Sequence, residues 1–141
     1  MVQAARSCKQ NIAEGSQSSG TSKKTELKLI GVARASLEEL LCDYQDWLRS
    51  HEDEQWAKDS AKAKLIRNLC YRPNRSYSTY RPYIEQKSAE TAANTLICLI
   101  HQTNFLLDRL LRQLEVAFQQ EGGFTERLYR TRQDRNTPSR R

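Results

Sequence analysis

The sequence predicts an all-α protein, an antiparallel up-and-down bundle of three to four helices. Apolar residues recur at spacings of three and four along most of the chain, which is typical of amphipathic helices. Only 5 Gly and 3 Pro occur among 141 residues, too few for an architecture of short strands and turns. The length suits one domain. We expect a helical bundle domain over residues 1–132 and a disordered basic tail over 133–141.

The first expected helix starts at the beginning of the sequence, with apolar residues at helical spacing. It is predicted to end at Gly15, because glycine readily takes the left-handed conformation that closes a helix. The polar stretch 16–22 then forms a loop. Its last residue, Ser22, has the side chain of an N-cap.

The second expected helix runs over about 22–50 and is the clearest element. Its apolar stripe extends from Leu27 to Leu48 without interruption, and Gly31 is its only weak interior position. At 1.5 Å per residue this helix is roughly 40 Å long, a length that is common in bundles.

The middle of the chain is less regular. An acidic, polar break covers 51–59, and a short helix is expected over 60–71, with Leu65, Leu69 and Cys70 on its apolar side. The segment 72–87 holds two of the three prolines and shows no helical period, so we predict a loop there.

The last long helix is expected over about 88–120. Ser88 provides an N-cap, and an apolar stripe that includes Leu106 follows from Ala92 to Phe118. The pair Gly122 and Gly123 is predicted to end this helix.

The net charge of +6 is distributed in stripes. Residues 1–34 carry six cations and two anions, residues 37–59 carry two cations and eight anions, and residues 127–141 carry six arginines and one aspartate. Basic stripes favour polyanionic partners, and they are equally explained by solubility and by packing of oppositely charged subunits.

Several classes of protein are excluded by sequence patterns. No apolar run approaches the ~18 residues of a membrane span, and no secretory leader is recognisable. The four cysteines lack the close pairs of zinc sites, so we expect reduced thiols in a cytoplasmic protein. The two histidines lack the Glu-x-x-His context of di-iron bundles, and nucleotide-binding and hydrolase motifs are missing. We therefore expect no enzyme activity, no metal and no cofactor.

Three groups of basic residues are candidate contacts to nucleic acid phosphates. One group could form a basic end of the bundle, and a second lies among four tyrosines in the segment 72–87 and its borders, a mixture that suits unstacked bases. The third group belongs to the C-terminal segment. The alternatives are a solvated face for the first group and a plain linker, with its tyrosines packed on the bundle, for the second. The candidates are Arg6, Lys9, Lys23, Lys24 and Lys28; Arg72, Arg75 and Arg81; and Arg127, Arg130 and Arg132.

Five further residues are interpreted as structural. Asn11, Glu14 and Gly15 belong to the sequence N-I-A-E-G at the predicted end of the first helix. Arg34 can pair with Glu38 one turn away, and Glu14 could reach Arg34 across the helix hairpin. A binding role for this charged pair is the alternative to a role in fixing the fold.

The segments QNIAEGS from Gln10, LIGVARASLEELLCDYQDWL from Leu29 and NTLICLIHQTNFLLDRLLRQLE from Asn94 support a resemblance, together with GGFTERLYR from Gly122. They resemble the four-helix-bundle proteins encoded in intervening sequences of bacterial ribosomal RNA genes, a superfamily that includes the accessory variability determinants of diversity-generating retroelements. The four-helix-bundle suffix group is the most similar. Members carry a further helix before the one that ends in N-I-A-E-G.

The resemblance implies an oligomeric bundle, with a ring of five subunits in the retroelement branch, where the protein binds nucleic acid and docks on a reverse transcriptase. Two hypotheses follow: a basic module that binds RNA or DNA, and an oligomeric scaffold that binds no nucleic acid. The sequence starts within the helix that ends in N-I-A-E-G, and we expect the apolar surface that a further helix would cover to be covered by other subunits of a cyclic homo-oligomer.

Overall fold

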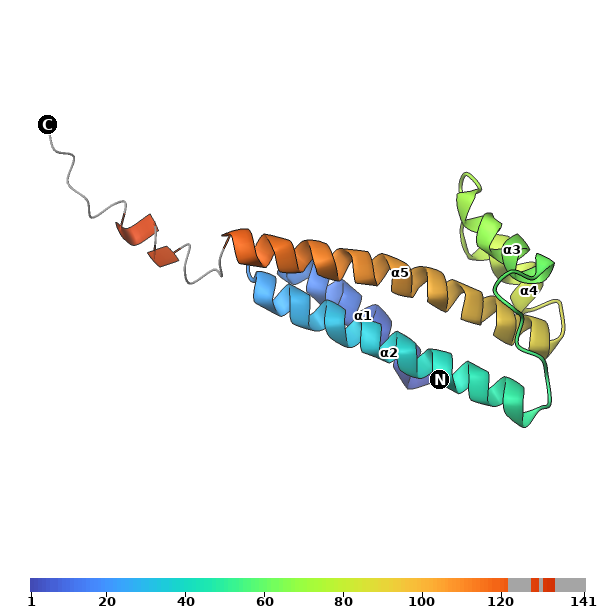
Figure 1. Cartoon of the computed structure of the whole chain (residues 1–141). Coiled ribbons are helices and arrows are strands. Elements are labelled where there is room, and N and C mark those ends of the chain that lie inside the picture. Colours follow the sequence, from blue (N-terminus) through green and yellow to red (C-terminus); the bar gives the residue numbers. More distant parts are fainter. Residues whose placement is uncertain (122–127, 130, 134–141) are drawn as a thin grey trace, which may run out of the picture.

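A computed structural model describes residues 1–121, 128–129 and 131–133 of the chain. The described part is all-α, as predicted, and it contains no strand. Figure 1 shows three long helices side by side and a cluster of short helices at one end. The helices are α1 (Val2–Ser18), α2 (Lys23–Ser50), α3 (Ala61–Asn68), the 3₁₀ helix η1 (Leu69–Tyr71), α4 (Tyr77–Ile84) and α5 (Ala89–Glu121).

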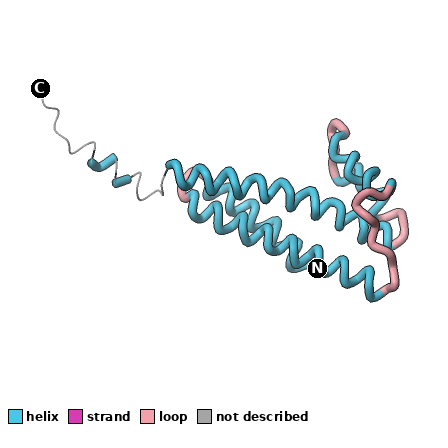
Figure 2. The backbone as a smooth tube through the Cα atoms, viewed as in Figure 1, coloured by secondary structure: helices cyan, strands magenta, loops and turns pink. Residues whose placement is uncertain are grey.

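Helix α2 is the centre of the bundle, and both α1 and α5 pack along it. The chain reverses between α1 and α2, so that Ser7 lies opposite Ser36, with 2.8 Å between their Oγ atoms. Helix α5 also runs antiparallel to α2, as the tube in Figure 2 makes visible. The three helices share one core, in which Cys8, Leu37 and Ile100 are all buried.

The cap and the stripe predicted for α2 are confirmed. The backbone N–H of Thr25 donates to Ser22 Oγ at 3.2 Å, which satisfies one of the free donors of the first turn. The predicted apolar stripe is buried along the helix from Ile30 to Leu48, the latter only 1% exposed. The N-cap predicted for α5 is also confirmed, because Thr91 donates its N–H to Ser88 Oγ at 3.2 Å.

The prediction that the first helix ends at Gly15 is wrong. Helix α1 continues to Ser18, and Gly15 is a buried helical residue facing α2. A Cβ atom at this position would lie 3.1 Å from Cδ1 of Ile30, so glycine allows the two helices to approach each other closely.

The loop predicted over 72–87 is also wrong in its centre, which forms α4. Ser76 and Thr79 make a capping box that starts this helix, and Pro82 lies within it. Pro73 precedes the helix and does not interrupt it. Arg81 and Glu85 add an ion pair of 2.7 Å across one turn.

Two predicted apolar positions point outwards. Leu65 of α3 is 48% exposed, whereas Ala63, Ile66 and Leu69 pack inwards. In α5, Leu106 is 62% exposed. Helix α5 packs on α2 and also on α3 and α4, so the stripe alone did not define which of its residues face solvent. The predicted stop at Gly122 and Gly123 and residues 134–141 of the predicted tail lie outside the described residues, whereas Gln133, the first residue of that tail, is helical.

The contact at Gly15 gives a stability prediction. We expect Gly15→Leu to destabilise the protein by about 1–3 kcal/mol, because the added side chain has no space against Ile30. Gly31 is the matched control, since nothing lies within 4 Å of a Cβ atom added there. Gly31→Ala should stabilise the helix by up to about 1 kcal/mol through its better helix propensity. Urea denaturation measures both variants, and a Gly15→Leu protein as stable as the parent would contradict the close approach.

Candidate nucleic-acid interface

A groove of about 1330 Å³ lies between α5 and the shorter elements formed by residues 55–80. One wall is α5 from Asn94 to Arg109, which at 1.5 Å per residue is about 22 Å long. The other wall contains residues of the connection between α2 and α3, of α3 and η1, and Tyr80 of α4. This volume exceeds the roughly 300–1,000 Å³ of pockets that hold a drug-sized molecule.

Asn94 fixes the connection between α2 and α3 on α5. Its side chain is only 1% exposed. Asn94 Oδ1 accepts the backbone N–H of Trp56 at 2.8 Å, and Nδ2 donates to the carbonyl oxygens of Glu54 at 2.9 Å and Glu90 at 3.1 Å. One buried amide therefore satisfies three backbone groups and holds Trp56 at the edge of the groove.

Helix α3 is fixed to α5 in a similar way. Gln102 Nε2 donates to the carbonyl oxygen of Arg67 near the end of α3 at 3.1 Å. At its start, α3 is capped by Ser60, whose Oγ accepts the N–H of Ala63 at 3.2 Å. Hydrogen bonds therefore hold both walls of the groove in position relative to each other.

The groove is lined by cations and aromatic rings. No carboxylate side chain lines it in the described part of the chain, although the connection carries Glu52, Glu54 and Asp59. A concave surface with one sign of charge concentrates the field and attracts counter-ions. The cations are Lys58, Arg67, Arg75 and Arg109, and the aromatic residues are Trp56, Tyr71, Tyr80 and Phe105.

Two of the rings are associated with a cation. Lys62 Nζ lies 5.5 Å from the ring centroid of Trp56, and the guanidinium carbon of Arg109 lies 5.9 Å from that of Phe105. Both distances are within the range of cation–π attraction. The two rings and Arg109 line the groove, Trp56 on the connection and the other two on α5, whereas Lys62 of α3 lies beside the groove and does not line it.

The basic residues predicted on α1 and α2 are not gathered at one end. Arg6 and Lys9 are near Ser7, which is level with the middle of α2, whereas Lys24 and Lys28 are on the first turns of α2. All four are exposed. Lys23 is partly buried and pairs with Glu26 at 3.2 Å, so its charge is balanced by a carboxylate of the same helix.

The structure divides the other predicted cations. Arg75 lines the groove. Arg72, three residues earlier in the sequence, is exposed and does not line it. Arg81 pairs with Glu85. The hydrogen bond from the Tyr77 hydroxyl and then that from Arg81 lower the pKa of the Glu85 carboxyl. Arg132 is exposed. Arg127 and Arg130 lie outside the described residues.

The structural residues form local and cross-helix contacts. Asn11 Nδ2 donates to the carbonyl oxygen of Ser7 at 2.8 Å. The predicted pair of Arg34 and Glu38 is confirmed at 2.6 Å. The predicted contact between Glu14 and Arg34 is wrong, because Glu14 accepts a hydrogen bond from Gln10 on its own helix at 2.9 Å.

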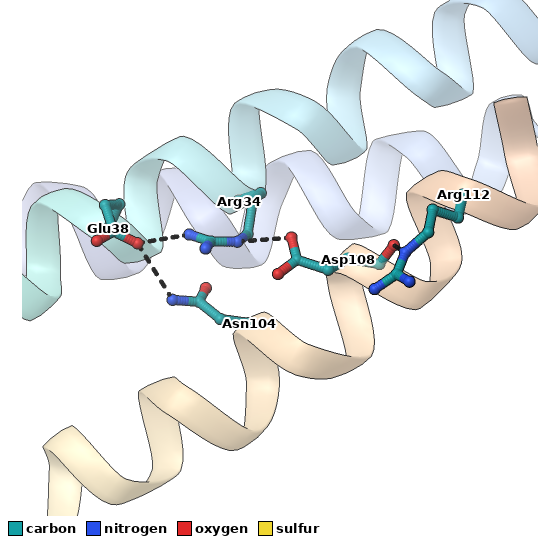
Figure 3. A network of polar contacts seen from close by, with 5 residues as sticks. All are labelled: Arg34, Glu38, Asn104, Asp108 and Arg112. Carbon is teal, nitrogen blue, oxygen red and sulfur yellow. Dashed lines mark hydrogen bonds and ion pairs between the residues drawn. The ribbon is translucent and has the colours of Figure 1, made fainter.

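The second partner of Arg34 is Asp108 of α5, at 2.9 Å (Figure 3). Asn104 also reaches towards α2, with Nδ2 3.5 Å from Glu38. The hydrogen bond to Glu38 is the main cause of the raised pKa of the Arg34 guanidinium, and Asp108 contributes to it. This network connects α2 to α5 and sets their register, so we interpret it as structural.

The Arg34 network gives a second stability prediction. Arg34→Met should destabilise the protein by about 1 kcal/mol, since a partly exposed ion pair with two partners is lost. Arg49→Met is the control, because within the described part of the chain Arg49 pairs only with Asp46 of its own helix, and both side chains are exposed. Urea denaturation at low and high salt should show the larger loss for Arg34→Met. Equal losses for both variants would contradict a role in helix register.

The described residues also bear on metal ligation, thiol chemistry and membrane spanning. They contain no group of three or more His, Cys, Asp or Glu side chains that could hold a metal ion. All four cysteines are free, and burial raises the pKa values of Cys8 and Cys98. None of the helices described combines the length and the apolar character required to cross a bilayer.

Comparison with protein family models, with curated proteins and with solved structures finds no match to this chain. The family resemblance therefore stays a prediction.

The groove contains residues that sequence patterns did not single out. Lys58, Arg67 and Arg109 lie on three different elements, and only the packing of α3 on α5 brings them together.

Proposed function

We propose that this protein is a non-enzymatic module that binds nucleic acid in the groove between α5 and the connection, α3, η1 and α4. The observation that carries this proposal is the lining of the groove, with four cations, four aromatic rings and no carboxylate side chain among the described residues. Arginine and lysine side chains contact phosphates without regard to sequence, and aromatic rings suit bases. By resemblance, we extend the proposal to an accessory subunit of a ribonucleoprotein or a reverse transcriptase.

The salt dependence of binding tests this function. A fluorescein-labelled 20-nucleotide RNA and a DNA of equal length should bind the protein at 50 mM salt. Binding should weaken steeply at 200 mM salt, because each phosphate contact releases counter-ions. Fluorescence anisotropy measures the affinity. Absence of binding at 50 mM salt would contradict the proposal and favour a scaffold.

A scaffold is the second candidate, and the exposed apolar residues of α5 favour it. Phe105, Leu106 and Val116 are each more than half exposed. Exposed apolar surface often marks an interface between subunits. A homo-oligomer, including a ring of five, would be detected by light scattering at micromolar concentration. A monomer of 16.4 kDa would contradict this second candidate.

A further inference from the structure

We propose that the groove selects single-stranded nucleic acid, with unpaired bases stacked on Trp56 and Phe105 and with the adjacent phosphates paired by Arg109 in the groove and by Lys62 at its edge. This inference rests on the proposed function and names its ligand more narrowly. The shared chemistry is a flexible strand with accessible base faces, which either RNA or DNA can supply.

The first step of the argument is the combination of ring and cation. Each of the two rings has a cation close to its centroid, at 5.5 Å for Lys62 and Trp56 and at 5.9 Å for Arg109 and Phe105. Stacking requires the flat face of a base, and a duplex keeps those faces inside its own stack. Because the cation lies over one face of each ring, a base would stack on the other face while its phosphate pairs with the cation, which requires a nucleotide whose base and phosphate are both accessible.

The second step is the accessibility of the rings. Phe105 is 59% exposed although it is a large apolar residue on a well-packed helix. Tyr71, which also lines the groove, is 83% exposed. Rings that are available to solvent in a positively charged groove are suited to stacking with bases.

The third step is an indole donor without an acceptor. Trp56 Nε1 is buried, and it makes no hydrogen bond in the described part of the chain. An unsatisfied buried donor is costly, and such groups in proteins require an explanation. The backbone N–H of Trp56 is already used by Asn94. A base carbonyl or phosphate oxygen would supply the acceptor that the indole lacks once the atoms that cover Nε1 move aside on binding.

Tryptophan fluorescence tests the inference, since the chain has only two tryptophans. Trp47 of α2 stacks on His51 and is not in the groove. The variant Trp47→Phe therefore leaves Trp56 as the single source of tryptophan emission. We expect oligo(U) and oligo(dT) of 12 nucleotides to quench the emission of Trp56 in a saturable way. A blunt 12-base-pair duplex should leave the emission unchanged. The RNA and DNA arms distinguish the two sources of the strand.

A second variant tests the ring on the other wall. Phe105→Leu should weaken binding of the single strands by roughly 5- to 100-fold and leave duplex binding unchanged, because one stacking contact is lost. Phe118→Leu is the matched control, the same substitution on α5 outside the groove. Circular dichroism confirms that each variant is folded.

The outcomes separate the inference from the function. Quenching by single strands together with a selective loss in Phe105→Leu supports the inference. Equal binding of single strands and duplexes without quenching would overturn the inference while leaving nucleic-acid binding in place. Absence of binding to any of these oligonucleotides at 50 mM salt would overturn both.

Discussion

Asn94→Leu is expected to lower the free energy of unfolding by about 2–4 kcal/mol. The leucine side chain is similar in size, but it leaves the N–H of Trp56 and the carbonyl oxygen of Glu54 without their partner in a part-buried setting. Each such group costs about 1–3 kcal/mol, and the gain in apolar burial offsets part of this. The loss is a large share of the ~5–15 kcal/mol that stabilises a typical domain.

The same substitution should also release the connection between α2 and α3. We expect the amide proton of Trp56 to exchange faster with solvent, and oligonucleotide affinity to fall, because one wall of the groove is no longer fixed. Asn11→Leu is the control, since among the described residues Asn11 bonds directly only to Ser7 of its own helix, and the link to α2 is made by Ser7 Oγ with Ser36. If Asn94→Leu costs no more stability than Asn11→Leu and leaves the Trp56 amide protected, the interpretation of Asn94 is wrong.

The second large effect concerns the cations of the groove. Replacing all four by glutamine should weaken single-strand binding by about 10³-fold at 50 mM salt, with a salt slope smaller by about 3. This follows from a slope of about 0.7 per phosphate contact on single strands. The replacements are Lys58→Gln, Arg67→Gln, Arg75→Gln and Arg109→Gln.

A matched variant removes four exposed cations from α1 and the start of α2 and has the same net charge. We expect it to lose less than tenfold in affinity, because only the long-range field changes. Its replacements are Arg6→Gln, Lys9→Gln, Lys24→Gln and Lys28→Gln. An equal loss in the two variants would show that charge, not the groove, determines binding. A larger loss in the second variant would place the interface on α1 and α2.

The architecture was accessible from sequence because it depends on local signals. The stripe of α2 has a single period, and the side chains of Ser22 and Ser88 define helix starts by capping. Predictions failed where tertiary contacts decide. Gly15 resembles a helix stop, but it serves the close approach of Ile30. Pro82 resembles a breaker, but it lies in a short helix that a capping box begins.

The candidate interface was only partly accessible from sequence. Arg75 and the tyrosines near it form a local cluster of charge and rings, and this signal pointed to the correct region. Arg109 is on α5, within a stripe that looks like core, and Trp56 is in an acidic stretch of the connection. Their relation to Arg75 depends on the packing of α3 and α4 against α5, which no sequence spacing encodes.

Photocrosslinking tests the central claim most directly. A single-stranded RNA that contains 4-thiouridine is bound at 50 mM salt and irradiated, and mass spectrometry locates the modified residues. We predict crosslinks at residues 55–80 and 98–109, centred on Trp56 and Phe105. Crosslinks confined to residues 6–28, with none in the groove, would contradict the claim that this groove binds nucleic acid.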